Sequence, residues 1–212
     1  GENVGVIGQN GAGKSTLLLH LNGILRGKGR VSVFDVDVGD KTLKLFRRKV
    51  GLVFQEPDDQ LFSPTVFDDV AFGPLSMGLA EDEVRARVSH ALECTGMALM
   101  AERAPHHLSG GQKKRVAIST VLALEPELLV FDEPAANLDP RSRHALIELL
   151  RSLPQTKVIA SHDLDLIKAL CQRTVIMDQG RIVADGATEH ILSDHDLLTR
   201  HGLATNSLAP RT

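Results

Sequence analysis

The chain has 212 residues, of which 42% are hydrophobic and 24% charged, and its formal net charge at pH 7 is −3. This length fits one α/β domain with a sizeable core, and the small net charge argues against a strongly basic face for nucleic acid. No apolar run approaches the roughly 18 residues that span a bilayer, so any association with a membrane would depend on a partner.

Residues 8–15 read Gly-Gln-Asn-Gly-Ala-Gly-Lys-Ser, which is the G-x-x-x-x-G-K-[ST] spacing of a phosphate-binding loop. The apolar run before it, Val4–Ile7, predicts a buried strand, and the leucine-rich stretch after it, 15–21, predicts a helix. Strand, glycine loop and helix form the context that the motif requires. The alternative, a glycine-rich turn before a core helix, is much weaker because both flanking elements fit.

The composition of this loop predicts how it would bind phosphate. Its glycines allow backbone conformations closed to other residues, so N–H groups of the loop and of the helix start can point at one anion. Lys14 would neutralise the outer phosphates, and the Ser15 hydroxyl would ligate Mg²⁺. The residues expected to bind the nucleotide are Gly8, Gln9, Asn10, Gly11, Ala12, Gly13, Lys14, Ser15 and Thr16.

The next segment predicts two strands and a helix. Residues 30–34 alternate like a half-buried strand, 41–49 favour a short basic helix, and 50–54 form an apolar strand that ends at Gln55. A glutamine at a strand end beside a nucleotide site is a candidate for contacting the metal or the attacking water. A solvated loop residue explains Gln55 equally well.

Residues 56–66 contain two prolines and three acidic residues, which predicts a loop. We expect this loop to expose the apolar pair Leu61 and Phe62, which would then leave apolar area in water unless a partner covers it. The alternative is that both side chains turn inward onto the neighbouring helices.

The region after this loop predicts a helical subdomain of about residues 74–107. A helix over 67–72, capped by Thr65 or Asp68, should end at Gly73-Pro74. Residues 81–96 then form an amphipathic pattern, and 97–103 favour a second short helix. The positions of the 81–96 helix that share one apolar face are Val84, Val88, Ala91 and Leu92.

Leu108–Gln112 reads Leu-Ser-Gly-Gly-Gln and predicts a second anion site. Ser109 is a good helix N-cap, and Gly110 with Gly111 would present backbone N–H groups at the start of a helix over 112–124. The preceding pair His106-His107 does not predict a metal site, because two adjacent histidines cannot easily share one ion without further ligands.

The apolar run 128–133 predicts a strand that ends in two acids, Asp132 and Glu133. Burying carboxylates is costly unless they bind something. Asp132 would hold Mg²⁺ through water beside Ser15, and Glu133 would polarise the attacking water. The alternative is a pair of acids that caps the next helix, which we place at Asp139-Pro140.

His162 directly follows a predicted buried strand over 156–161. Because parallel strands bind ligands at their carboxyl edge, His162 should lie at the site; a capping or buried structural histidine is the alternative. Strands over 173–177 and 181–184 should form a hairpin, followed by a short helix over 187–193. We expect the tail, 204–212, to be mobile.

The phosphate loop, Gln55, Leu-Ser-Gly-Gly-Gln, the Asp132-Glu133 strand, Asn137-Leu138-Asp139 and His162 occur in one order that resembles the ATP-binding cassette family of transport ATPases. The resemblance covers residues 1–203. It implies a phosphate-loop NTPase fold with a mainly parallel core sheet, a small antiparallel part and an inserted helical subdomain. Leu108–Gln112 makes the resemblance specific, since many NTPases share the phosphate loop.

A narrower resemblance rests on residues 55–66, 69–74, 110–118 and 191–194. These segments are similar to the ATPase subunits of energy-coupling-factor importers, especially the cobalt and nickel branch. Vitamin importers of the same class share much of the pattern and stay open as an alternative, as does a non-transport ATPase of the family. DNA-repair, regulatory and translation-factor relatives fit less well, because the chain lacks a coiled-coil insertion or basic surface, has Glu133, and holds one cassette.

The resemblance implies a mechanism with ATP and Mg²⁺ as substrate and cofactor. Two copies, or this chain and a second ATPase subunit, would close head to tail on the cytoplasmic face of the membrane. Glu133 would be the general base, His162 and Gln55 would sense the γ-phosphate and metal, and Asp139 would link the two sites. The segment expected to clamp the γ-phosphate of the other copy is Ser109, Gly110, Gly111 and Gln112. Integral membrane subunits would move on closure.

The chain departs from the family pattern at its start. It enters its first core strand within four residues, which leaves no room for a preceding edge strand, and we expect an N-terminally shortened form. Family members usually carry on that strand an aromatic residue that stacks on adenine, and no residue of this sequence occupies the position.

Overall fold

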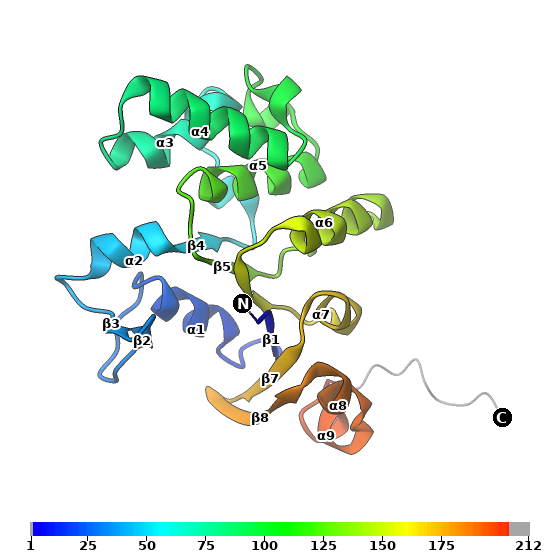
Figure 1. Cartoon of the computed structure of the whole chain (residues 1–212). Coiled ribbons are helices and arrows are strands. Elements are labelled where there is room, and N and C mark those ends of the chain that lie inside the picture. The colour runs from blue at the N-terminus through cyan, green and yellow to red at the C-terminus, as the bar shows by residue number, and fades with distance from the viewer. Residues whose placement is uncertain (1, 204–212) are drawn as a thin grey trace.

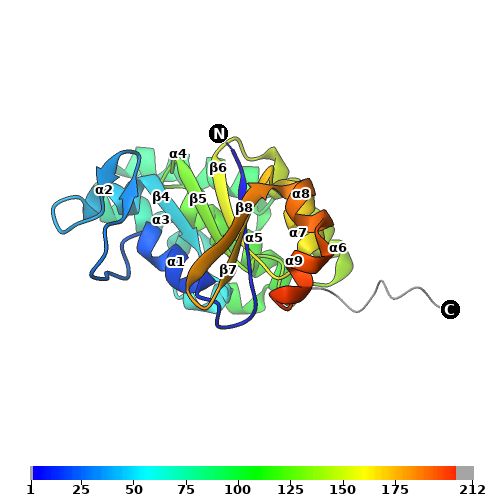
Figure 2. The same ribbon diagram turned by 90° about the horizontal axis from the view of Figure 1, so that it is seen from below.

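The structure, a computed structural model, describes residues 2–203. Its centre is a six-stranded sheet in which all neighbours are parallel except the last pair. In sheet order the strands are β4 (Val50–Val53), β5 (Leu128–Asp132), β6 (Thr156–Ala160), β1 (Val4–Ile7), β7 (Arg173–Asp178) and β8 (Arg181–Ala187). Figure 2 shows them crossing the molecule side by side. The predicted fold class is confirmed.

Helices cover both faces of the sheet because successive strand residues point to opposite sides. In β5, Leu129 and Phe131 pack into one hydrophobic cluster, while Leu128 and Val130 pack into another. The second cluster faces α1 (Lys14–Leu21) and α2 (Leu43–Lys49). The helices that contribute to the first are α5 (Gly110–Leu122), α6 (Pro140–Ser152), α7 (Leu164–Leu170), α8 (Thr188–Ser193) and α9 (His195–Arg200).

The helical part forms a third cluster, on the far side of α5 from the sheet (Figure 1). It comprises α3 (Val66–Ser76), α4 (Glu81–Cys94) and short 3₁₀ turns at Ala98–Met100 and Pro105–His107. The predicted apolar face of α4 is confirmed, since Val84, Val88, Ala91 and Leu92 are all buried. The 97–103 helix contracts to the turn at Ala98–Met100.

The prediction that Leu61 and Phe62 are both exposed is half wrong. Leu61 is buried in the helical cluster, whereas the Phe62 residue is 66% exposed and stacks edge-to-face on Phe72. The carboxylate of Asp69 accepts hydrogen bonds from the backbone N–H groups of Phe62 and Ser63, at 3.0 and 2.8 Å. This fixes the loop so that neighbouring side chains take opposite directions.

The expected helix end at Gly73-Pro74 is also wrong. Thr65 caps α3 as predicted, but the helix continues to Ser76, and Gly78 then adopts the positive φ typical of a helix end. Pro74 removes one backbone donor near the end of the helix, where the loss interrupts little. Gly73 lies in the helix because it packs on Leu124, whose side chain a Cβ would meet at 2.7 Å.

The other differences concern short elements. The strand expected over 30–34 is only β2 (Ser32–Val33), paired with β3 (Val36–Asp37) through a turn in which Phe34 and Asp35 have positive φ. Helices α7 and α9 have no counterpart in the prediction. The tail expected to be mobile, 204–212, lies outside the described residues. Within residues 2–203 no helix is both long and apolar enough to cross a membrane.

Candidate active site

The carboxyl ends of four parallel strands converge at one edge of the sheet and bring the predicted residues together. The phosphate loop follows β1, Gln55 follows β4, Glu133 follows β5 and His162 follows β6. A cavity of about 250 Å³ opens there. It is lined by Asn10, Gly11, Gly13, Lys14, Ser15, Thr16, Gln55, Asp132 and Glu133.

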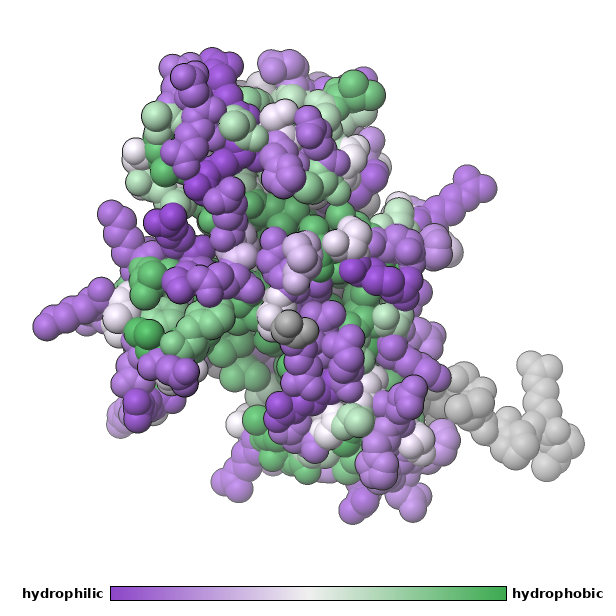
Figure 3. Space-filling model, in the orientation of Figure 1, coloured by the Kyte–Doolittle hydropathy of each residue, from purple (hydrophilic) through white to green (hydrophobic). Residues whose placement is uncertain are grey.

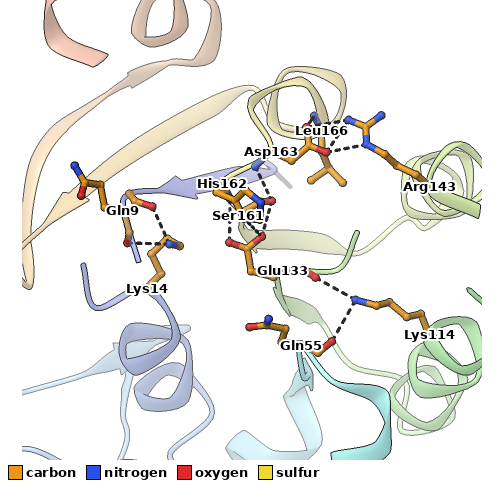
Figure 4. Close-up of polar contacts among 11 residues, drawn as sticks. Gln9, Lys14, Gln55, Lys114, Glu133, Arg143, Ser161, His162, Asp163 and Leu166 are labelled. Carbon is orange, nitrogen blue, oxygen red and sulfur yellow. Dashed lines mark hydrogen bonds and ion pairs between the residues drawn. The ribbon is translucent and has the colours of Figure 1, made fainter. Parts of the chain in front are cut away.

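The phosphate loop has the backbone that its glycines allow. Gly11 and Gly13 have φ of 82° and 102°, which favour glycine. A Cβ on Gly8 would lie 2.4 Å from the carbonyl oxygen of Met177, so this position needs glycine because another strand passes close by. The Lys14 ammonium donates to the carbonyls of Gly8 and Gln9, at 2.8 and 3.2 Å, and so lies folded over the loop (Figure 4).

Asp132 and Ser15 form a donor set that fits Mg²⁺. Burial raises the pKa of the Asp132 carboxyl, as does the adjacent Glu133, against a hydrogen bond from Ser15 and the charge of Lys14. One carboxylate oxygen, Oδ1, is buried without a hydrogen-bond partner among the described residues. Buried carboxylates are normally paired or bind metal, and a carboxylate with a hydroxyl suits this hard cation.

Glu133 is held in a backbone conformation unusual for its type, with φ of 44°. Such a conformation costs of order 1 kcal/mol and persists where the surroundings hold it. The Glu133 N–H donates to the carbonyl of Ala160 at 2.9 Å. Its carboxylate accepts from Ser161 Oγ and from the N–H of His162, each at 3.0 Å, and lies 2.9 Å from His162 Nδ1 (Figure 4).

His162 is neither a helix cap nor a buried structural histidine. Its side chain is 66% exposed, and Asp163, not His162, caps α7 by accepting from the N–H of Leu166. Asp163 also pairs with Arg143 through two hydrogen bonds and donates its N–H to Ser161 Oγ. Sequence reasoning missed Ser161, Asp163 and Arg143; the run of polar residues after an apolar strand was the available signal for the first two.

The Leu108–Gln112 segment lies apart from this cavity. Ser109 and Gln112 form a reciprocal capping box, in which each backbone N–H donates to the other's side chain, and α5 begins at Gly110 rather than at the expected position 112. Of the described residues that line the phosphate-loop cavity, none belongs to this segment. Asp139 caps α6 as predicted, and hydrogen bonds from Ser142 lower the pKa of its carboxyl.

Comparison with known proteins agrees with this geometry. The family model for ABC transporters matches residues 1–136, which is more than half of the chain. The chain belongs to the ABC transporter family. It is an ATP-binding domain of the ATP-hydrolysing type.

Relatives place the domain among transport ATPases. The energy-coupling factor transporter ATP-binding protein EcfA of Methanothermobacter thermautotrophicus is 50% identical over 209 residues, which covers 96% of this chain and 67% of that protein. CbiO1 from Clostridium perfringens, part of the ABC transporter complex CbiONQ, has a TM-score of 0.82 and 39% identity, covering 95% and 83% of the two chains. An ATP-binding cassette solved as a dimer in a post-hydrolysis state with ADP and Pi has a TM-score of 0.77 and 28% identity, covering 88% and 85%.

Proposed function

We propose that this ABC ATPase powers an energy-coupling-factor importer that carries cobalt or nickel ions. The similarity to EcfA and to a subunit of the CbiONQ complex supports the class of importer, and the narrower sequence resemblance supports the cargo. A vitamin importer of the same class is the second candidate, because the EcfA relative fits it equally well. The ATPase would sit at the membrane surface as a peripheral subunit.

In this proposal Glu133 is the general base for the attacking water. Ser161 and His162 orient its carboxylate from one side, while Glu133 itself lines the cavity at the phosphate loop. Lys14 and the N–H groups at the start of α1 neutralise the phosphates. His162 and Gln55 contact the γ-phosphate, and Ser15, Asp132 and Gln55 hold Mg²⁺. The bound ion would screen the charge of the phosphates.

The site needs a second copy to be complete. The Ser109–Gln112 segment of one chain does not line its own phosphate cavity, and the similar cassette was solved as a dimer. We therefore propose a head-to-tail dimer, in which this segment of one subunit closes over the γ-phosphate held by the other. Asp139, at the cap of α6, would lie near the same interface and link the two sites.

A groove away from the nucleotide cavity is the proposed attachment point for the membrane subunits. Its volume is about 840 Å³, and it lies between α2 and the helices α3 and α5. Phe54, Phe62, Phe72 and Leu124 supply apolar lining. Figure 3 shows hydrophobic surface at this junction between the helical part and the body below. An apolar groove of this kind suits an amphipathic helix.

A buried acid beside the groove holds the loop that carries Phe62. Asp69 lines the groove and is buried, and its Oδ1 holds the loop at Phe62 and Ser63. Its other oxygen, Oδ2, has no hydrogen-bond partner within the part of the chain that the structure describes.

The single observation that carries the transporter proposal is the exposed Phe62 in this groove, seven residues after Gln55 in the nucleotide cavity. Phe62→Ala should leave the ATPase rate of the isolated protein within about twofold and reduce binding to the membrane subunit, with loss of metal uptake in proteoliposomes. Truncating an exposed ring removes apolar contact with the partner but little of the core.

Leu61→Ala is the matched control. Leu61 is buried in the helical cluster, so its truncation should cost about 2–5 kcal/mol of stability. If Phe62→Ala lowers the ATPase rate as much as uptake, or destabilises the protein as much as Leu61→Ala, Phe62 does not dock a partner. Uptake assays with Co²⁺, Ni²⁺ and vitamins in the same vesicles decide between the two cargo classes.

A further inference from the structure

Lys114, on α5, connects the segment that carries Gln55 to the segment that carries Glu133. It lies on α5, two residues after Gln112, and it is buried, with an exposure of 7%. Its ammonium donates to the carbonyl of Gln55 and to the carbonyl of Glu133, each at 3.2 Å (Figure 4). One side chain of α5 therefore contacts the backbone of two residues that line the cavity.

The chemistry of this contact explains why a lysine is buried here. An ammonium is a compact donor of three hydrogen bonds on a flexible stem, so it can satisfy two carbonyls that end different strands. Burial lowers the pKa of Lys114, while the charges of Glu56 and Glu133 raise it. The effect of burial is the larger, so the pKa of Lys114 is lowered; the two carboxylates, which lie on the same segments as the carbonyls, offset part of the cost of burying the ammonium.

The contact with Glu133 acts at a strained residue. Glu133 keeps φ of 44°. Its N–H donates to Ala160, its carboxylate accepts from Ser161 and His162, and its carbonyl accepts from Lys114 and from the N–H of Ala136 at 3.1 Å. Of these contacts, that of Lys114 comes from α5. The direction of the Glu133 carboxylate depends on this backbone conformation, so we expect loss of the Lys114 contact to alter it.

We propose that Lys114 is a positioning residue for ATP hydrolysis, which fixes Gln55 and Glu133 relative to each other and ties both to the helix that begins at Ser109. This rests on the proposed roles of Gln55 and Glu133. Since α5 carries the segment that meets the second nucleotide, Lys114 makes the geometry of one site depend on the position of the helix that serves the other. Lys114 itself does not line the phosphate-loop cavity.

Lys157 provides a matched control within the same protein. It is also a buried lysine, at the amino end of β6, and its ammonium donates to the carbonyls of Leu153 and Gln155 at 2.6 and 2.8 Å. These carbonyls belong to the connection between α6 and β6, at the opposite edge of the sheet from the cavity. Loss of its ammonium should therefore affect stability without affecting the site.

The experiment measures steady-state ATP hydrolysis and thermal unfolding of the full chain carrying Lys114→Met, Lys114→Gln or Lys157→Met. We expect Lys114→Met to lower kcat at least tenfold while the KM for ATP changes less than threefold. Lys114→Gln retains a donor of two hydrogen bonds and should recover most of kcat. Lys157→Met should lower the Tm at least as much as Lys114→Met and leave kcat within twofold.

Two outcomes would overturn the inference. One is a Lys114→Met variant with kcat within twofold of the unmodified protein. The other is a ratio of kcat loss to Tm loss that is the same in Lys114→Met and Lys157→Met, since the loss of kcat would then follow from the loss of stability. Glu133→Gln, measured in parallel, distinguishes failure of the Lys114 proposal from failure of the proposed function. If Glu133→Gln is inactive and Lys114→Met is fully active, only the role of Lys114 is wrong. If Glu133→Gln retains its rate, the proposed base is wrong.

Discussion

Replacing Glu133 by Gln should separate catalysis from folding, and the contacts of the carboxylate show why. Its Oε1 accepts from the N–H of His162, and its Oε2 lies against Ser161 Oγ and His162 Nδ1. An amide oxygen in place of Oε1 still accepts from the backbone. An amide nitrogen in place of Oε2 can donate to Ser161 Oγ and to Nδ1 of neutral His162, so the side chain keeps its position.

Glu133→Gln should have a small effect on stability and a large effect on the rate of hydrolysis. Changing charge-assisted hydrogen bonds to neutral ones should cost on the order of 1 kcal/mol, which is a Tm shift of about 2–4 °C for a chain of this size. The amide has no basic oxygen to take a proton from water. Loss of a general base lowers the rate by about 10²–10⁴, or about 3–5 kcal/mol in activation free energy.

The assay compares phosphate release at saturating Mg-ATP with equilibrium ATP binding and with the elution volume on a sizing column. Glu133→Gln should bind ATP normally, release phosphate at less than 1% of the original rate, and accumulate as an ATP-bound dimer. Phosphate release above about a tenth of the original rate would show that another group takes the proton. A loss of Tm much beyond about 4 °C would mean that the carboxylate is chiefly a structural acceptor.

Two further predictions concern stability. Burial raises the pKa of the Asp163 carboxyl, but the hydrogen bonds and charge of Arg143 outweigh it and the pKa is lowered; the resulting stability is present above the unfolded pKa of about 3.9 and is lost as pH falls. The urea-unfolding free energies of Asp163→Asn and the unmodified protein should therefore differ at pH 7 and approach each other as the pH falls below about 3.9. In Gly51→Ala a Cβ would lie 2.1 Å from Val121, which should cost about 1–3 kcal/mol, while Gly29→Ala, with open space around it, should leave the Tm unchanged.

The sequence predicts which candidate residues gather at one edge because these residues stand at strand ends. Once Val4–Ile7, 50–54, 128–133 and 156–161 are recognised as buried parallel strands, their carboxyl ends must meet at one edge, and Gln55, Asp132, Glu133 and His162 are carried there with them. Periodicity also identified the buried face of α4, and capping identified Asp139 at the start of α6. The strand pattern therefore determines which residues gather at the site.

The orientation of those residues could not be predicted, because it depends on contacts between distant elements. Nothing local indicates that Ser161 donates to Glu133 or that Lys114 reaches both flanking carbonyls. The same holds for Leu61 and Phe62, whose opposite directions are set by Asp69 seven or more residues away. The path of α3 through Pro74 depends on Gly73 packing against Leu124, which local propensity does not contain.

The loop between the nucleotide cavity and the groove is fastened to α5 at two points. The Gln60 amide donates to the carbonyl of Ala117 at 2.9 Å and to Thr120 Oγ1 at 2.6 Å. Lys113 pairs with Asp58 at 2.6 Å. Each contact joins the loop to the helix rather than to the sheet.

These attachments determine what a partner in the groove would move. Because hydrogen bonds link the loop to α5 at Lys113, Ala117 and Thr120, we expect a displacement of the loop to carry α5 with it. The same helix begins at Gly110, directly after the Ser109 cap. The proposed membrane contact and the proposed γ-phosphate clamp are thus parts of one packed unit, and the Lys114 hydrogen bonds are the point at which that unit contacts the backbone of Gln55 and Glu133.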